Sequence, residues 1–323
     1  MDEIRFGVVG LGMGHNRSVL ISKTPGARLV AVCDLDEARC RRTAEATGCE
    51  WTTVYDDLLA RKDIDVVFVM VPSGMHAEFG IKAARAGKHV VTTKPIEVTL
   101  EAADRLIEAC KEAGVMLAVD FEYRYLPGSV IVKEAIDRGL FGKMVFGEVI
   151  LKWYRSQSYY DAGGWRGTWR YDGGGSLMNQ TIHDIDLLLW FMGKPKWVMG
   201  HASVNTHKIE TEDLGMAMIE FESGAKGRIL GTTTHPVSLP VVREFHGDRL
   251  GVRMVDGELT WFLPDGVPVP DIEPSGPRNI VEDIVGALRD SRPPRVTGEE
   301  GRRSVELAKA IYRSAEQGAP VLL

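Results

Sequence analysis

Residues 4–16 decide the fold, and they read Ile4-Arg5-Phe6-Gly7-Val8-Val9-Gly10-Leu11-Gly12-Met13-Gly14-His15-Asn16. The first six residues form a short apolar run that is typical of a buried strand. We expect Gly10 to allow a tight turn and Gly12 to let backbone N–H groups approach a pyrophosphate at the start of the next helix. Gly14 comes one residue earlier than the usual third glycine, so the sequence predicts a shortened dinucleotide-binding loop that also contains Met13.

A second apolar run, residues 29–34, ends in an acid at the spacing expected for ribose recognition. Asp34 lies 24 residues after Gly10 (34 − 10), and a carboxylate at about this distance binds the adenosine ribose in dinucleotide-binding folds. Asp34 is alternatively a helix N-cap before Asp36, but the order of strand, loop, helix, strand and acid favours the ribose. Because Asp34 would repel a 2′-phosphate, we predict NAD as the cofactor, and nearby Arg39 keeps NADP as the alternative.

The order of the elements predicts an α/β fold with two domains. Strand-like and helix-like patterns alternate up to residue 121, as in a doubly wound parallel sheet. Beyond it we expect mostly antiparallel strands at residues 143–154, 197–205, 214–222, 227–234 and 241–246, an irregular excursion at 264–278 and a last helix at 307–315. The prediction is therefore a Rossmann-like dinucleotide-binding domain at 1–121 and an α+β domain at 122–323, whose open-faced sheet serves substrate binding and self-association.

Two further segments carry candidate catalytic side chains. Residues 173–186 read as a glycine turn and a helix capped by Ser176, with Asn179 and His183 one turn apart on one face. Proton transfer requires such a positioned imidazole, although the pattern also fits a histidine that hydrogen-bonds within the core. Lys94 follows a strand-like run and precedes a proline, at the sheet edge where ligands bind; an ordinary surface lysine is the alternative.

Bulk properties exclude several classes of protein. The chain has 323 residues, of which 44% are hydrophobic, and a net charge of −6. This negative charge gives no electrostatic footprint for binding nucleic acid. No apolar stretch reaches membrane-spanning length and the N-terminus reads as a strand, so we expect a cytoplasmic protein without a membrane partner. The four cysteines form no C-x-x-C pair, and His183, Asp184 and Asp186 lack a second cluster of ligands, so we predict no metal.

As a set, these residues resemble the Gfo/Idh/MocA family of sugar and cyclitol oxidoreductases over nearly the whole chain. The resemblance rests on the glycine loop, Cys33-Asp34, residues 72–76, residues 87–95, Tyr123-Arg124-Tyr125, Gly142-Lys143, Trp165-Arg166 and residues 173–186. It implies a nicotinamide cofactor, Lys94 and His183 as catalytic residues, and a cis bond between Lys94 and Pro95. It also places near the cofactor Pro72, Ser73, His76, Thr93 and Glu122, of which Ser73, Thr93 and Glu122 depart from the family's usual residues.

Asn179 is a further departure, because the family often has Asp four residues before the histidine. An amide orients a substrate hydroxyl but does not raise the imidazole pKa as a carboxylate would. We therefore expect His183 to be neutral near pH 7, which suits a general base, with Asn179 as its partner in the site. Further candidates for substrate binding, each alternatively structural, are Tyr123, Arg124, Trp165 and Arg166.

The predicted reaction is hydride transfer between a nicotinamide and a secondary hydroxyl of a sugar, cyclitol or sugar derivative. His183 would take the hydroxyl proton, while Lys94 would bind the substrate and stabilise the developing alkoxide. Two alternatives remain: a glycosidase of the same family that oxidises its sugar transiently with NAD, and a non-catalytic binder that senses nucleotide or sugar. We expect a homodimer or homotetramer that associates through the C-terminal sheet.

Overall fold

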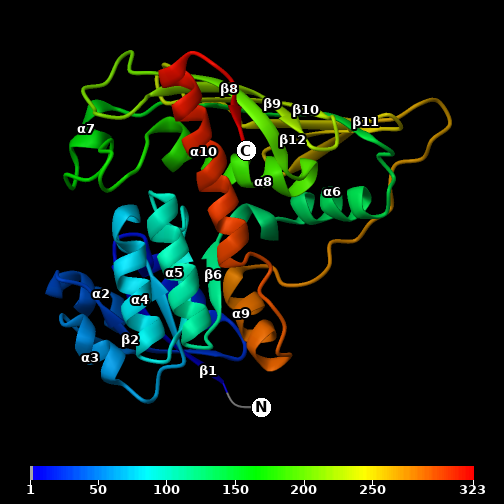
Figure 1. Cartoon of the computed structure of the whole chain (residues 1–323). Helices are drawn as coiled ribbons and strands as arrows, with labels where there is room; N and C mark the ends of the chain where they lie inside the picture. The colour runs from blue at the N-terminus through cyan, green and yellow to red at the C-terminus, as the bar shows by residue number, and fades with distance from the viewer. Residues whose placement is uncertain (1–2) are drawn as a thin grey trace. The chain divides into compact units, whose positions relative to one another are not determined.

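Two structural units make up the chain in the computed structural model, which describes residues 3–323 (Figure 1). The first unit holds residues 3–121 together with 277–302, and the second holds 122–276 and 303–323. The expected second domain, 122–323, thus differs in one segment, which returns to the first unit. In that segment α9 (Ile280–Arg289) contacts β2 (Ala27–Cys33), and the backbone N–H of Val119 donates to the carbonyl of Val296 at 3.1 Å.

The first unit is the predicted doubly wound parallel sheet. Its described strands lie in the order β3-β2-β1-β4-β5-β6 and pair in parallel throughout. Besides β2, they are β1 (Ile4–Val9), β3 (Glu50–Thr52), β4 (Val66–Val69), β5 (His89–Thr93) and β6 (Leu117–Asp120). The strand order reverses between β1 and β4, which is the point where such sheets bind ligands.

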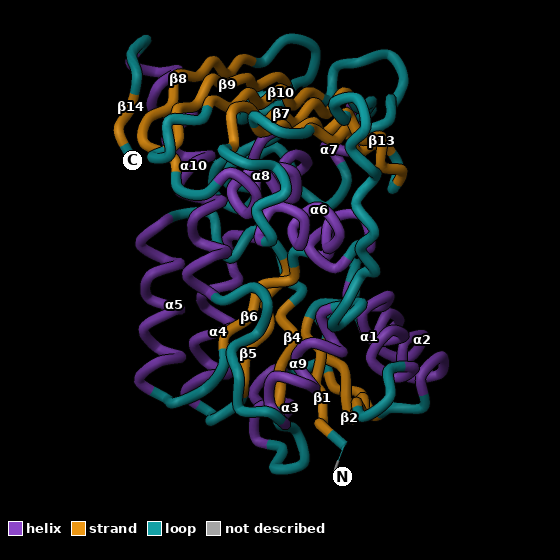
Figure 2. The backbone as a smooth tube through the Cα atoms, turned by 90° about the vertical axis from the view of Figure 1, so that its right-hand side faces the viewer, coloured by secondary structure: helices purple, strands orange, loops and turns teal. Residues whose placement is uncertain are grey.

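Helices cover both faces of this sheet. Figure 2 shows α4 (His76–Arg85) and α5 (Leu100–Glu112) on one side, and α1 (Gly14–Lys23) and α2 (Glu37–Thr47) on the other. The short α3 (Tyr55–Ala60) joins β3 to β4. Because both faces are covered, the strands read as continuous apolar runs, and the core includes Phe6, Val8 and Phe68 without any exposure.

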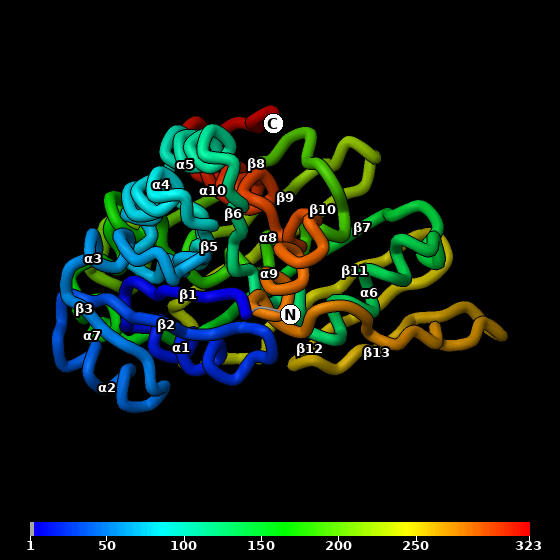
Figure 3. Tube along the Cα trace, turned by 90° about the horizontal axis from the view of Figure 1, so that it is seen from below, coloured from blue at the N-terminus to red at the C-terminus, as the bar shows by residue number. Residues whose placement is uncertain are grey.

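The second unit contains a mixed sheet with the order β13-β12-β11-β7-β10-β9-β8-β14. The five predicted strands are β7 (Met144–Lys152), β8 (Pro195–Ser203), β9 (Leu214–Phe221), β10 (Lys226–Thr232) and β11 (Val242–Gly247). Neighbours pair antiparallel except β7 with β10. The sequence did not predict β12 (Gly251–Val255), β13 (Glu258–Phe262) and β14 (Val321–Leu322). Figure 3 shows the irregular segment that follows β13.

One face of this sheet packs on helices, and the other carries exposed side chains that include Met216 and Met218. A side chain at Gly147 of β7 would meet Met192 of α8 (Ile182–Met192). A side chain at Gly200 of β8 would meet Ile311 of α10 (Gly298–Gln317), which contains the expected last helix. The remaining helices are α6 (Pro127–Asp137) and α7 (Gln157–Asp161). Residues 3–323 contain no helix that is both long and apolar enough to cross a bilayer.

Candidate functional site

The glycine loop after β1 has the geometry that dinucleotide binding requires. Gly10 has φ +88°, and a Cβ there would lie 2.7 Å from the carbonyl of Met70. A Cβ at Gly12 would meet nothing within 4 Å, which leaves room for a ligand against the backbone. Gly14 would bring a Cβ within 3.3 Å of Val8, so it provides the close approach of helix to strand that a third glycine gives. The shortened loop is therefore complete.

The start of α1 leaves its backbone N–H groups to an anion. Its N-cap is Met13, no side chain caps the helix, and the first turn carries no acid. An uncapped helix N-terminus next to a glycine turn attracts a phosphate through N–H groups and the helix dipole. These residues fit the pyrophosphate of a dinucleotide.

Asp34 closes this loop from the end of β2. Its carboxylate accepts hydrogen bonds from the backbone N–H groups of Leu11 at 2.6 Å and Asp36 at 2.9 Å. The helix-capping role considered for Asp34 belongs to Asp36, which accepts from the backbone N–H groups of Ala38 and Arg39. The Arg39 guanidinium lies 3.3 Å from the Asp36 carboxylate and 3.9 Å from that of Asp34, so two carboxylates offset its charge.

Lys94 follows β5 at the carboxyl edge of the sheet, and the Lys94-Pro95 bond is cis, as the resemblance implied. His76 supports this turn from the start of α4. Its Nδ1 lies 2.8 Å from the carbonyl oxygen of Pro95, and its Nε2 lies 2.9 Å from that of Val71. Thr93 and Lys94 are half-buried in the same turn.

The cofactor contact expected for His76 stays a prediction, and within the fold the side chain has another role. The side chain has no exposed surface, both ring nitrogens face backbone carbonyls, and burial lowers the imidazole pKa. Its role is to join the turn after β4, which contains Pro72 and the buried Ser73, to the turn that carries Lys94. Buried Glu97 holds the same region by accepting from the N–H of Ala77 at 2.8 Å, a residue that sequence reasoning missed.

In the second unit the expected helix around His183 begins as a π-helical turn and continues as an α-helix. Residues Ser176–Thr181 form a π-helical turn, and His183 lies in the first turn of α8. Ser176 is not an N-cap, because its hydroxyl donates to Glu212 at 3.4 Å from inside the turn. Asn179 lies within the π-helical turn, four residues before His183, and a π-helical turn is closed by hydrogen bonds between residues five apart.

A buried carboxylate holds this turn. Glu212 accepts hydrogen bonds from the N–H groups of Gly175 at 2.9 Å and Leu177 at 2.7 Å, and from the Tyr312 hydroxyl at 2.9 Å. Burial raises the pKa of the Glu212 carboxyl, and these donors oppose that rise. A Cβ at Gly175 would lie 1.9 Å from the Glu212 carbonyl, so only glycine fits there. Sequence reasoning missed Glu212, whose signal was an acidic pair directly before β9.

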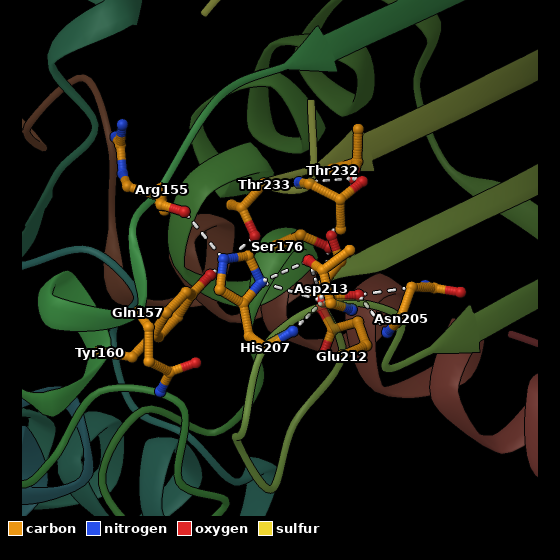
Figure 4. A network of polar contacts seen from close by, with 12 residues as sticks. Arg155, Gln157, Tyr160, Ser176, Asn205, His207, Glu212, Asp213, Thr232 and Thr233 are labelled. Carbon is orange, nitrogen blue, oxygen red and sulfur yellow. Dashed lines mark hydrogen bonds and ion pairs between the residues drawn. The ribbon is translucent and has the colours of Figure 1, made fainter. Parts of the chain in front are cut away.

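The second acid of that pair, Asp213, centres the polar network of Figure 4. Burial alone would raise its pKa, but hydrogen bonds from Thr206, Asn205 and His207 hold it at about 2. His207 lies 3.0 Å from the Asp213 carboxylate through Nδ1 and 2.8 Å from the carbonyl of Arg155 through Nε2. The network therefore fixes the backbone where the chain leaves β7.

Aromatic and ionic contacts fix the His183 ring. The ring of Tyr123 stacks on the imidazole with centroids 4.5 Å apart and an interplanar angle of 27°. The Arg243 guanidinium lies 4.8 Å from the Tyr123 ring centroid and pairs with the Asp184 carboxylate. His183 is 8% exposed, so its ring is positioned and largely shielded from water. Burial also raises the pKa of the Tyr123 hydroxyl.

The substrate contact expected for Arg124 stays a prediction, and within the fold its side chain is engaged by an acid. Its guanidinium donates to both carboxylate oxygens of Asp186, at 2.7 and 2.8 Å, and lies 5.2 Å from the Trp190 ring centroid. Arg124 is only 3% exposed. This bidentate buried pair joins the turn after residue 121 to α8, which is a structural role.

Asn179 faces a carboxylate that sequence reasoning also missed. Its side-chain amide donates to Asp172, whose other oxygen accepts the N–H of Gly167 at 2.8 Å. The amide nitrogen of Gln180 donates to the side-chain oxygen of Asn179 at 2.9 Å and to the Tyr159 hydroxyl at 3.0 Å. Asn179 is therefore hydrogen-bonded to the loop that contains the expected Trp165-Arg166 pair.

The other expected residues are placed as follows. Trp165 and Arg166 are half-buried in the loop after α7, and Glu122 is exposed at the start of the turn that contains Tyr123. Asp184 and Asp186 are each paired with an arginine. Over residues 3–323, no three His, Cys, Asp or Glu side chains are grouped so as to hold a metal ion.

Both parts of the chain are similar to one set of known proteins. Residues 4–121 match the model of the oxidoreductase family with an NAD-binding Rossmann fold, GFO/IDH/MocA, and residues 130–253 match the GFO/IDH/MocA C-terminal domain. The chain is 26% identical to scyllo-inositol 2-dehydrogenase (NAD(+)) of Bacillus subtilis, over 99% of this chain and 96% of that protein. It is 32% identical to inositol 2-dehydrogenase of Rubrobacter xylanophilus, over 81% of this chain and 72% of that protein.

A solved structure is similar over the whole length. The WlbA dehydrogenase from Bordetella pertussis, in complex with NADH and UDP-GlcNAcA, superposes with a TM-score of 0.91 at 34% identity. The match covers 100% of this chain and 98% of that one. The glycine loop, the turn at Lys94 and the helix of His183 thus lie in a chain whose two parts both match dehydrogenases.

Proposed function

The chain belongs to the Gfo/Idh/MocA family of NAD(P)-dependent oxidoreductases, and we propose that it oxidises a secondary hydroxyl of a sugar-like substrate with NAD. The observation that carries this proposal is the position of His183. Its imidazole is stacked on Tyr123, held at the head of α8 and shielded from water. A histidine fixed in this way suits proton transfer to or from a hydroxyl.

The first unit supports NAD as the cofactor over NADP. The open space at Gly12 and the uncapped start of α1 fit a pyrophosphate, and Asp34 lies at the end of β2. A 2′-phosphate would meet the Asp34 carboxylate, and Arg39 is already flanked by two acids. We further propose that Gly10, Gly12, Met13, Gly14, Asp34, Pro72, Ser73, Thr93 and Glu122 line the cofactor site.

We assign the proton and charge steps to two side chains. Bound NAD would supply the hydride acceptor. His183 takes the proton of the substrate hydroxyl, and the Lys94 ammonium stabilises the negative charge that develops on that oxygen. Tyr123 orients the imidazole, while Asn179, Trp165 and Arg166 bind the substrate.

Turnover of NAD by purified protein tests the proposal. We would follow reduced nicotinamide by its absorbance with scyllo-inositol, myo-inositol, levoglucosan and UDP-GlcNAcA as substrates. On an accepted substrate, His183→Ala should lower kcat by about 10²- to 10⁴-fold, the range for a positioned acid or base. Lys94→Ala should lose most turnover because its charge acts mainly on the transition state. The matched variant Lys111→Ala changes an exposed side chain and should keep the parental kcat.

Three outcomes decide between the possibilities. Parental turnover in both Lys94→Ala and His183→Ala would refute the assigned roles. Sugar cleavage with NAD recycled and no net reduction would identify the glycosidase alternative. NAD binding without either reaction would identify the binder.

We also propose that the protein is a cytoplasmic homodimer or homotetramer that associates through the uncovered face of the second unit's sheet. That face carries the exposed side chains of Met199, Met216 and Met218, and Met199 pairs across strands with Met218. Exposed apolar clusters of this kind mark association surfaces. Met218→Lys should shift the mass measured by light scattering to that of a smaller species, and an unchanged mass would contradict the proposed surface.

A further inference from the structure

Two arginines flank one tyrosine ring in the second unit. The guanidinium of Arg155, which follows β7, lies 5.2 Å from the ring centroid of Tyr159 in α7. The guanidinium of Arg166, in the loop after α7, lies 4.6 Å from the same centroid and 5.0 Å from that of Trp165. Both arginines are half-buried. Two positive charges are therefore concentrated around one ring in a chain whose net charge is −6.

Within residues 3–323, neither guanidinium has a counter-ion. No carboxylate lies within 4.0 Å of Arg155 or Arg166, whereas the buried Arg124 and Arg243 are paired with Asp186 and Asp184. Asp172, an acid of the same loop, is engaged by Asn179 and Gly167. Placing two cations together in a partly desolvated position costs free energy unless an anion joins them.

Arg166 has a free hydrogen-bonding edge. Its Nη1 donates to the carbonyl of Ala162 at 3.1 Å, while its Nε and Nη2 donate to nothing within the described chain. These two nitrogens form the edge of a guanidinium that binds two oxygens of a carboxylate or phosphate at once. The edge is thus available to an anionic ligand.

Arg155 is held in place by the fold. Its backbone N–H donates to the carbonyl of Thr233 at 3.1 Å, and its carbonyl lies 2.8 Å from Nε2 of His207 (Figure 4). Its Nη2 donates to the side-chain oxygen of Gln180 at 2.8 Å, and Gln180 donates to Asn179. The arginine pair is therefore connected by hydrogen bonds to the turn that leads into His183.

We propose that the arginine pair, Arg155 and Arg166, binds an anionic group of the substrate, a carboxylate or a phosphate. Arg166 supplies the two-pronged contact, and Arg155 adds a second charge while it orients Gln180. The natural substrate is then an acidic sugar or a sugar phosphate derivative, and not a neutral cyclitol. This inference rests on the proposed function, because it names the substrate class of the same site.

Four probes separate the two sources of charge. UDP-GlcNAcA carries a carboxylate and a diphosphate, UDP-GlcNAc only the diphosphate, glucuronate only the carboxylate, and myo-inositol neither. We would measure Kd by calorimetry on NAD-loaded protein and KM wherever NAD is reduced. At least one anionic probe should bind about 10-fold or more tightly than myo-inositol, and the charged group shared by the tight probes identifies the source.

Variants locate the binding. Arg166→Gln should raise the Kd of the tightly bound anionic probe by about 10- to 100-fold, as expected for losing hydrogen bonds to a charged group. Arg166→Lys keeps the positive charge but cannot bind two oxygens at once. Its Kd should lie between those of the parent and of Arg166→Gln. The control Arg138→Gln removes a charge that is exposed and paired with Glu134, and it should leave Kd unchanged.

The inference is overturned if myo-inositol binds as tightly as every anionic probe, or if Arg166→Gln keeps the parental affinity for them. Its failure is distinct from failure of the proposed function. NAD reduction by neutral substrates alone would remove this inference and leave the oxidoreductase standing. Tight, Arg166-dependent anion binding without any NAD reduction would support the anion site and refute the oxidoreductase.

Discussion

Replacing Asn179 by Asp probes the contact between the turn before His183 and the preceding loop. The Asn179 amide donates to one carboxylate oxygen of Asp172, and the other oxygen accepts the N–H of Gly167. Asp172 is almost fully buried. Asn179→Asp therefore places two carboxylates against each other in a shielded position. From sequence alone, a carboxylate at 179 was expected to act on the His183 imidazole; in the structure it would also face the Asp172 carboxylate.

The cost follows from the lost hydrogen bond and the new repulsion. A hydrogen bond to a charged group contributes about 1.5–3 kcal/mol, and two adjacent carboxylates avoid ionising together by holding a proton. We expect Asn179→Asp to lower the free energy of unfolding by about 2–4 kcal/mol at about pH 7.5. The folded variant would then bind a proton that the unfolded chain has released. The deficit should therefore shrink as the pH falls to about 5.

An exchange of the two residues provides the control. In the double variant Asp172→Asn/Asn179→Asp, the amide at position 172 donates to the carboxylate at 179 and its oxygen still accepts from Gly167. Urea unfolding of both single variants and the double variant should show recovery to within about 1 kcal/mol of the parent. The reasoning is refuted if Asn179→Asp is as stable as the parent at both pH values and shifts the acidic limb of the rate profile to higher pH.

Three further predictions concern other parts of the chain. Glu212→Gln turns an amide nitrogen toward backbone N–H donors, so urea unfolding should show a loss of about 2–4 kcal/mol, whereas Glu222→Gln, in an exposed pair, should change stability by less than about 0.5 kcal/mol. Burial lowers the His76 pKa below its usual value of 6.5, so unfolding takes up a proton. The free energy of unfolding should therefore fall as the pH drops below about 6.5, less steeply in His76→Gln. Asp34→Ser should raise the Kd for NAD and move the NAD-to-NADP preference toward NADP in fluorescence titrations, and an unchanged ratio would contradict the role of Asp34.

The first unit was predictable because its signals are local. Apolar runs, the glycines at 10, 12 and 14, and Asp34 lie within a few dozen residues of one another, and their order alone predicts a doubly wound sheet. The returning segment, 277–302, carries no such signal. It joins the first unit through contacts such as Val119 to Val296, which are far apart in the chain.

The site in the second unit was predicted in part, for a similar reason. Glycines and a histidine at helical spacing indicated a turn leading into a helix, and α8 starts at Ile182. The π-helical turn was not predicted, because it depends on Glu212 reaching Gly175 and Leu177 from more than thirty residues away. Local propensity does not encode a cap that comes from another element.

The arginines show how long-range pairing decides function. In the sequence, Arg124 and Arg166 each follow an aromatic residue, and both were reasonable substrate contacts. Asp186, 62 residues away from Arg124, accepts hydrogen bonds from two nitrogens of that guanidinium, and the pair is buried. No described acid does the same for Arg166 or for Arg155, a residue that the sequence did not single out. Fixed cations that the fold leaves without an internal anion are the ones on which a charged substrate can act, and this difference makes Arg166, and not Arg124, the site of the proposed anion.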